Sequence, residues 1–165
     1  MLDLLGSADP NFVPRAILDV GCGTGRLLRA AGARWPQARL LGVDPAEGMV
    51  SQAKKLLPKG RIHLGSAEML PLPDAAVDLV TSSLSFHHWT DQMRGLQEVA
   101  RVLRSGGYVC IADIALPRWL AWLLGSRART PSAIQALLIG AGLVVSDQMR
   151  LLLRVVLVSL GRLPA

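Results

Sequence analysis

A glycine-rich turn is the segment of this sequence whose composition most clearly predicts ligand chemistry. Residues 19–25 read Asp-Val-Gly-Cys-Gly-Thr-Gly, so Gly21, Gly23 and Gly25 alternate with other residues after Asp19. Alternating glycines let the backbone turn sharply and let a ligand approach it without obstruction by Cβ atoms. A helix that begins directly after such a turn points its free N–H groups at an anionic group. A plain tight turn is the alternative interpretation of the same residues.

An acidic residue, Asp44, follows the second apolar run, 19 residues after Gly25. A carboxylate at this position can accept both hydrogen bonds of a ribose diol. Asp44 could also cap the next helix, with Pro45 at the first helical position. The two roles are compatible, so the capping alternative does not argue against a nucleotide-like ligand.

A histidine pair, His87-His88, follows the fourth apolar run and directly precedes Trp89. A neutral imidazole suits a general base near pH 7, so His87 and His88 are candidate catalytic residues. The alternative is that the three residues only shape a loop and cap the next helix. His63 stands alone in the third run and is expected to be structural.

We expect no metal site. The sequence has only two cysteines, and its His, Asp and Glu residues are not grouped at the spacing of metal ligands.

The elements that must position these residues alternate along the chain. Short apolar runs predict strands over residues 15–20, 40–43, 61–64, 76–81 and 108–114. Helical spacing predicts helices over 26–35 and 46–57, a helix capped by Thr90 and stopped by Gly106-Gly107, and a helix from Thr130-Pro131 to Gly142. Residues 143–149 and 154–160 predict a closing hairpin. This alternation predicts a doubly wound α/β fold with a parallel sheet covered on both faces and ligands at the carboxyl ends of its strands.

Length and charge indicate one folded domain. The chain has 165 residues, of which 51% are hydrophobic and 18% charged, which excludes disorder. We expect a single domain over 1–165, with a closing helix and hairpin at 130–161. The net charge of +6 arises in residues 101–165, where arginines are scattered singly, so we expect no nucleic-acid partner. With no secretory leader and no run of about 20 apolar residues, a cytoplasmic location is expected.

Five segments together resemble a known family. Residues 17–28, 43–50, 65–78, 82–89 and 103–108 look like the motifs of the class I S-adenosylmethionine-dependent methyltransferases. They are most similar to the small-molecule branch that includes the ubiquinone and menaquinone biosynthesis methyltransferases. The resemblance implies a Rossmann-like sheet of strand order 3-2-1-4-5-7-6, with strand 7 antiparallel, and S-adenosyl-L-methionine as the cofactor. It also implies a cofactor half at 15–114 and a lid segment at 116–129.

The same resemblance implies roles for individual residues. The glycine turn would lie under the methionine moiety, Asp44 would hold the ribose hydroxyls, and the backbone of Ser82 would meet the amino-acid end. Residues at the adenine would be Pro45 and Met49 on its flanks and the Ser66-Ala67 pair at its edge. The positions that match cofactor contacts are Asp19, Gly21, Cys22, Gly23, Gly25, Asp44, Pro45, Met49, Ser66, Ala67 and Ser82.

Two features depart from the family pattern. Ser66 stands where the family usually has Asp, and a neutral hydroxyl accepts a hydrogen bond from the adenine amino group more weakly than a carboxylate. Only residues 1–6 resemble the helical cover that relatives carry before the first strand, which predicts a shortened cover.

The expected function is methyl transfer to a small, apolar or cyclic metabolite by in-line displacement. The alternative is a cofactor-binding but inactive fragment, or a partner-dependent subunit; a nucleotide-dependent oxidoreductase is a more remote one. Ser82-Ser83-Leu84-Ser85 lacks the polar-Pro-Pro-aromatic run of nucleic-acid base methylases. Trp119 and Trp122, with Arg118, Arg127 and Arg129 around them, could form an acceptor lid, contact a membrane surface, or form a homodimer face. A packed connecting helix is the plainer interpretation.

Overall fold

Strands that are apolar on both faces form the centre of the structure. The computed structural model describes residues 1–115, 118–123, 129–151 and 156–164. In chain order the elements are α1 (Leu2–Ala8), β1 (Ala16–Val20), α2 (Arg26–Arg34), β2 (Arg39–Asp44), α3 (Glu47–Leu56), β3 (Arg61–Leu64), β4 (Val77–Ser83), the 3₁₀ turn η1 (Phe86–His88), α4 (Gln92–Val102), β5 (Leu103–Ile114), α5 (Arg118–Leu123), α6 (Pro131–Gly140), β6 (Val144–Leu151) and β7 (Val156–Arg162). Every residue of β1 is buried, which explains why all of them but Asp19 are apolar.

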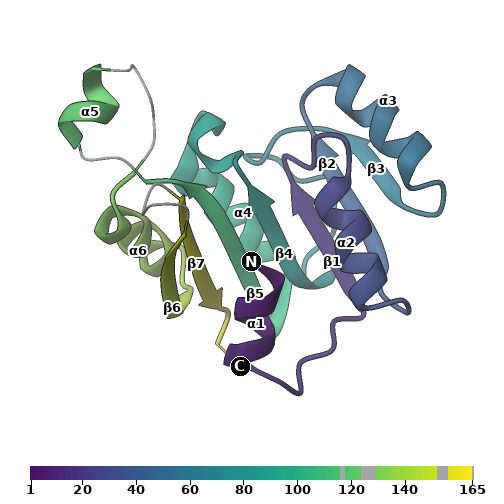
Figure 1. Cartoon of the computed structure of the whole chain (residues 1–165), viewed down its shortest axis with the longest axis horizontal. Coiled ribbons are helices and arrows are strands. Elements are labelled where there is room, and N and C mark those ends of the chain that lie inside the picture. Colours follow the sequence, from purple (N-terminus) through teal and green to yellow (C-terminus); the bar gives the residue numbers. More distant parts are fainter. Residues whose placement is uncertain (116–117, 124–128, 152–155, 165) are drawn as a thin grey trace.

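The seven strands form one sheet in the order β3-β2-β1-β4-β5-β7-β6 (Figure 1). Strands β1 to β5 pair in parallel, whereas β7 is antiparallel to both β5 and β6. This confirms the predicted strand order and the closing hairpin, although Arg154 lies outside the described residues. The order reverses between β1 and β4, so ligands are expected above the carboxyl ends of these strands.

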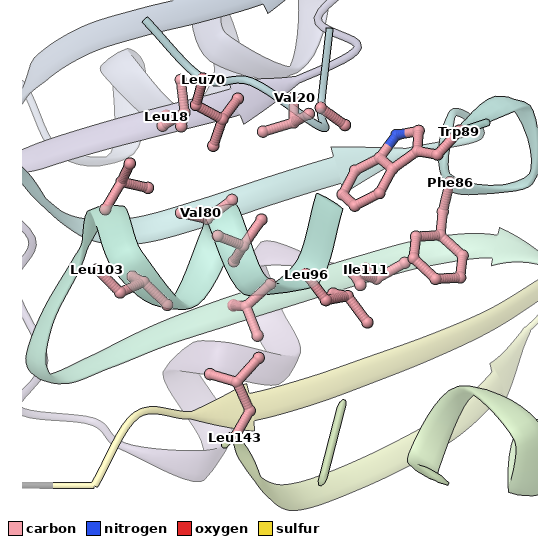
Figure 2. Close-up of a cluster of buried hydrophobic side chains, with 14 of the residues drawn as sticks. Leu18, Val20, Leu70, Val80, Phe86, Trp89, Leu96, Leu103, Ile111 and Leu143 are labelled. Carbon is pink, nitrogen blue, oxygen red and sulfur yellow. The ribbon is translucent and has the colours of Figure 1, made fainter. Parts of the chain in front are cut away.

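Two apolar layers cover opposite faces of the sheet, because neighbouring residues of a strand point to opposite sides. Ile17 and Leu79 face a layer formed with α1, α2 and α3. Leu18 and Val80 face a second layer, formed with α4 and α6. Figure 2 shows this second layer, in which Leu96 of α4 lies against the strands and is fully buried.

The first helix, α1, covers part of the first layer. Its Leu4 and Leu5 are buried with the side chains of β5 and β7. A hydrogen bond of 3.1 Å from the Tyr108 hydroxyl to Asp9 Oδ2 fastens the residue after α1 to β5. Residues 1–6, predicted to resemble a helical cover, therefore contribute most of α1, a packed helix that lies across the sheet (Figure 1).

Two predicted boundaries around α4 were wrong. Asp91, and not Thr90, is the N-cap, because its carboxylate accepts a hydrogen bond from the backbone N–H of Arg94. The helix ends at Val102, before the glycine pair, because Leu103 becomes extended and pairs with Val77 of β4. Gly106-Gly107 lies instead within β5. The predicted cap at Thr130 is confirmed by a bond from the Ala133 N–H to its hydroxyl, with Pro131 at the first helical position.

Candidate functional site

The glycine turn between β1 and α2 has the backbone conformation that its sequence predicts. Gly21, Gly23 and Gly25 have φ angles of 70°, 53° and 81°, which side-chain-bearing residues rarely adopt. The N–H groups of Gly21 and Cys22 both donate to the carbonyl of Val43, which fixes the turn beside the end of β2. A Cβ on Gly23 would have no atom within 4 Å. This side of the turn is therefore open to a ligand.

Asp44 connects the glycine turn to the start of α3. Its Oδ2 accepts from the Gly23 N–H at 2.8 Å and its Oδ1 from the Ala46 N–H at 2.9 Å. The N-cap of α3 is Ala46, so the structure does not support the alternative role of Asp44 as a helix cap with Pro45 at the first helical position. Each carboxylate oxygen has more than one lone pair, so both can accept a further bond, such as those of a diol.

Asp19 lies under the turn and is buried at the end of β1. The Thr81 hydroxyl donates to its Oδ1 at 2.8 Å. Burial raises the pKa of Asp19 to about 7; the Thr81 bond lowers it and the charge of Asp44 raises it further, by smaller amounts. A carboxyl group that changes charge near neutral pH thus lies directly beneath the glycine turn.

A cavity of about 130 Å³ lies beside these residues, between the ends of β1, β2 and β3 and the segment after β4. Its lining residues are Val20, Gly21, Val43, Pro45, Gly65, Ser66, Ala67, Glu68, Ser85, His88, Trp89 and Thr90. Of the residues predicted to lie at the adenine, Pro45, Ser66 and Ala67 line this cavity, whereas Met49 is exposed on α3 outside the lining. Pockets that enclose a drug-sized ligand measure about 300–1,000 Å³, so this cavity matches one ring system and not a whole nucleotide-like molecule.

The side chain of Cys22 turns away from the cavity into the core. A Cβ placed on Gly42 of β2 would lie 2.9 Å from Cys22 Sγ, which shows how closely the thiol packs against that strand. Burial raises the pKa of Cys22 to about 12, with smaller contributions from the charges of Asp19 and Asp44. Cys22 can therefore meet a ligand only through its backbone.

Ser82 is buried near the carboxyl end of β4. Strand alternation places its side chain on the same face as Val80, toward α4. In the described part of the chain, its hydroxyl is a buried polar atom without a hydrogen-bond partner. Its side chain thus lies on the core side of the strand, which leaves its backbone as the part that a ligand at the strand end can reach.

Glu68 is a cavity residue that the sequence analysis missed. Its Oε1 accepts from the N–H groups of Thr90 and Asp91, at 2.7 and 3.1 Å, so it ties the segment after β3 to the start of α4. Burial raises its pKa, but hydrogen bonds from backbone N–H groups and the Ser66 hydroxyl outweigh that effect, and the pKa of Glu68 is lowered overall. A carboxylate therefore lies beside Ser66, where the family pattern has Asp.

Ser85 and the two aromatic residues that follow it hold the segment after β4 over the turn. A Cβ on Gly21 would overlap the Ser85 hydroxyl, so this contact requires glycine. Phe86 and Trp89 are buried with their ring centroids 4.9 Å apart, and Figure 2 shows both side chains in the core layer. His87 and His88 lie between these anchors, so the sequence Phe-His-His-Trp places two imidazoles at the site.

The two histidines differ in their surroundings. His88 is exposed and lines the cavity, whereas His87 Nδ1 lies 2.6 Å from Oδ1 of Asp113, at the end of β5. The two imidazole centroids are 3.9 Å apart. Asp113 is not among the predicted site residues, all of which precede the fifth strand. Its position near the carboxyl end of the fifth strand is the signal that could have found it.

Arg101 of α4 holds residues 70–74, which follow the segment that contains Ser66 and Glu68. Its guanidinium donates to both oxygens of Glu98, to Asp74 and to the carbonyls of Leu70 and Leu72. Glu98 also accepts from the Leu70 N–H at 2.9 Å. A planar guanidinium is suited to such a set of acceptors, whereas a lysine could satisfy only some of them.

We expect Arg101→Met to lower the free energy of unfolding by about 1–3 kcal/mol, because it leaves the largely buried Glu98 without its paired cation. Arg101→Lys should have an intermediate effect. Arg94→Met is the matched control, because Arg94 is exposed and its contacts are long: its nitrogen lies 3.9 Å from Glu98 and its Nε donates to the Glu68 carbonyl at 3.3 Å. A change below about 0.5 kcal/mol is therefore expected. Urea unfolding measures all three variants. Equal losses in Arg101→Met and Arg94→Met would contradict this role.

A larger cavity, of about 600 Å³, lies between α2 and α3 at the amino ends of β2 and β3, away from the glycine turn. Arg29, Arg39, Lys59 and Arg61 contribute to its lining. Arg39, Lys59 and Arg61 follow the C-terminal ends of the two helices, where basic side chains complement the helix dipoles. Their position after the helix ends explains these three basic residues without a ligand in the larger cavity.

The predicted lid segment 116–129 is only partly described, since residues 116–117 and 124–128, Arg127 among them, lie outside the described residues. Trp119 and Trp122 on α5 are 67% and 83% exposed, and Figure 1 shows α5 standing apart from the sheet. Arg129 donates to the Gln92 side chain of α4 at 2.7 Å.

The described residues contain no group of three or more His, Cys, Asp or Glu that could hold a metal ion. None of the helices in this part of the chain is long and apolar enough to cross a membrane.

The strand order, the glycine turn after β1 and the acid after β2 define a doubly wound domain of the nucleotide-binding kind. Residues 18–111 match the family described as "Methyltransferase domain", which is more than half of the chain. The chain therefore belongs to the methyltransferase domain family.

Similar proteins agree with this assignment. An uncharacterized methyltransferase of Mycobacterium tuberculosis is 37% identical over 109 residues, which are 66% of this chain and 44% of that protein. The demethylmenaquinone methyltransferase of Thermotoga maritima is 32% identical over 104 residues, 63% of this chain and 45% of that protein. The chain thus spans less than half the length of these relatives. The crystal structure of an S-adenosylmethionine-dependent methyltransferase from Mesorhizobium loti shares the fold, with a TM-score of 0.81, 22% identity and coverage of 97% and 96% of the two chains.

Proposed function

We propose that this chain binds S-adenosyl-L-methionine and transfers its methyl group to a small, apolar or cyclic acceptor by in-line displacement. The observation that supports the proposal most strongly is the arrangement of Gly23 and Asp44. The open face of Gly23 lies beside a carboxylate whose two oxygens are already oriented by the backbone N–H groups of Gly23 and Ala46. Such a carboxylate is preorganised to accept the two hydroxyls of a ribose.

The residues present fit the chemical parts of this cofactor. Asp44 would hold the ribose, and Pro45, Ser66 and Ala67, which line the small cavity, would hold the adenine, with Met49 at its outer side. Glu68 would supply the carboxylate that Ser66 lacks. The backbone of Gly21, Cys22, Gly23 and Gly25 would lie under the methionine moiety, between Asp19 and the end of β4 at Ser82.

Bound S-adenosylmethionine would supply an electrophilic methyl group on a sulfonium. The chain's own task is to hold the acceptor in line with that group and to keep water away. Phe86 and Trp89 fix the segment after β4 over the glycine turn. In this position His87 and His88 would orient the acceptor or take its proton.

We also propose a cytoplasmic location for the protein. Cys22 and Cys110 are free and buried, which fits a reducing compartment.

Calorimetric titration of the purified chain with S-adenosylmethionine and S-adenosylhomocysteine tests the proposal. We expect micromolar binding that Asp44→Asn weakens about tenfold or more, because the amide keeps only one acceptor oxygen. Glu47→Gln is the matched control, because Glu47 is an exposed acid in the first turn of α3 that does not line the small cavity, and it should bind as the wild type does. Absence of binding by a folded wild-type chain would overturn the proposal.

A further inference from the structure

A buried carboxylate holds one of the two histidines of the site. Asp113 lies near the carboxyl end of β5, its side chain is 1% exposed, and it faces His87 of η1. Its Oδ2 accepts from the His87 backbone N–H at 2.7 Å. Its Oδ1 lies 2.6 Å from His87 Nδ1 and also accepts from the Ile114 N–H at 2.6 Å. The Asp113 carboxylate thus contacts both the backbone N–H and the imidazole of His87.

This arrangement determines where the imidazole proton lies. A carboxylate can only accept hydrogen bonds, so His87 Nδ1 must be the donor and carry the proton. In the neutral ring, Nε2 is then the nitrogen with a free lone pair. The His87 side chain is 15% exposed, and its ring lies against His88, which lines the cavity beside the glycine turn. A base with a fixed tautomer is therefore present beside the proposed cofactor site.

We propose that Asp113 is a positioning residue that holds His87 as a general base, and that the acceptor is one that must lose a proton on methylation, such as a phenol or an enol. This inference rests on the proposed function. The acceptor O–H proton passes to His87 Nε2, and the oxygen electron pair forms the new bond to the methyl carbon. The electron pair of the broken carbon–sulfur bond stays on sulfur, and His87 later releases its proton to water.

The phenol or enol class follows from the need for a base. An acceptor with a free lone pair, such as a thioether or a tertiary amine, needs no base to attack a methyl group. A phenol or an enol gains reactivity when its proton leaves, and the Asp113 carboxylate stabilises the imidazolium that forms on His87. If Asp113 only accepted bonds from the backbone N–H groups of His87 and Ile114, replacing it would leave the His87 tautomer unchanged.

Nitrogen NMR of the full chain, labelled with ¹⁵N-histidine and measured without cofactor at about pH 9, reads the tautomer directly. His87→Gln assigns the signals. We expect wild-type His87 to be protonated at Nδ1, and Asp113→Asn to shift it toward the Nε2-protonated form, because the new amide can donate to Nδ1. Asp91→Asn, at the exposed N-cap of α4, is the matched control and should leave the tautomer unchanged.

A wild-type His87 protonated mainly at Nε2 would overturn the inference, and this measurement does not require any variant to fold. An unchanged tautomer in a folded Asp113→Asn would overturn it as well. Acylation by diethyl pyrocarbonate gives a second readout, because a free Nε2 is the reactive atom; its rate at His87 should fall about tenfold in Asp113→Asn. These results do not involve S-adenosylmethionine, so they remain distinct from a failure of cofactor binding in the titration above.

Discussion

Replacing Gly21 with alanine is expected to lower the free energy of unfolding by about 2–4 kcal/mol, whereas the same replacement at Gly23 should cost about 1 kcal/mol. Both glycines have a positive φ angle, so both variants incur the strain of a left-handed conformation. The difference comes from their neighbours, because a Cβ on Gly21 would overlap the Ser85 hydroxyl and a Cβ on Gly23 would meet no atom.

Binding and stability should separate in these two variants. Gly23→Ala keeps its fold but places a methyl group on the face that we assign to the cofactor, so its affinity for S-adenosylmethionine should fall about tenfold or more. Gly21→Ala must displace the segment after β4, so its thermal midpoint should fall by several degrees more than that of Gly23→Ala. Thermal unfolding and calorimetric titration measure both effects. Equal stabilities of the two variants would show that the close contact between Gly21 and Ser85 does not require glycine.

The fold was predictable because burial on both faces leaves a clear signal in the sequence. The run over Ala16–Val20 is apolar except for Asp19, because Ile17 and Leu18 each meet a covering layer. The sequence is ambiguous at the start of α4, because Thr90 and Asp91 are both good capping residues. Only the path of the backbone decides that Asp91 is the N-cap. The signal fails at Gly106-Gly107, because strand pairing with β4 begins at Leu103, before the glycines.

The candidate site was predictable where its residues lie close together in the sequence. The glycine turn occupies seven consecutive residues, and Asp44 is the last residue of β2. Glu68 and Asp113 were missed because their partners are distant in the chain: Glu68 binds the N–H groups of Thr90 and Asp91, and Asp113 binds His87, 26 residues away. Such contacts arise from the order of the strands in the sheet, which brings together residues that no local pattern connects.

Asp19→Asn is expected to stabilise the protein at pH 8, by an amount on the order of 4 kcal/mol, while leaving its stability at pH 4 nearly unchanged. Burial raises the pKa of Asp19 from 3.8 to about 7. Between these values the folded state binds a proton that the unfolded state has lost, so the stability of the wild type falls as the pH rises. Above pH 7 the folded protein must hold a buried charge, which asparagine removes while keeping an acceptor for the Thr81 hydroxyl.

Urea unfolding at intervals from pH 5 to pH 8 tests this expectation. The wild type should lose stability from pH 5 to about pH 7 and level off above it, and Asp19→Asn should lose much less. Asp147→Asn, which replaces an exposed carboxylate of β6, should retain the wild-type slope. Parallel slopes for wild type and Asp19→Asn would contradict the raised pKa. If Asp19→Asn is more stable at pH 8 but binds S-adenosylmethionine less tightly, the buried acid is kept at a cost in stability because the cofactor site needs its charge.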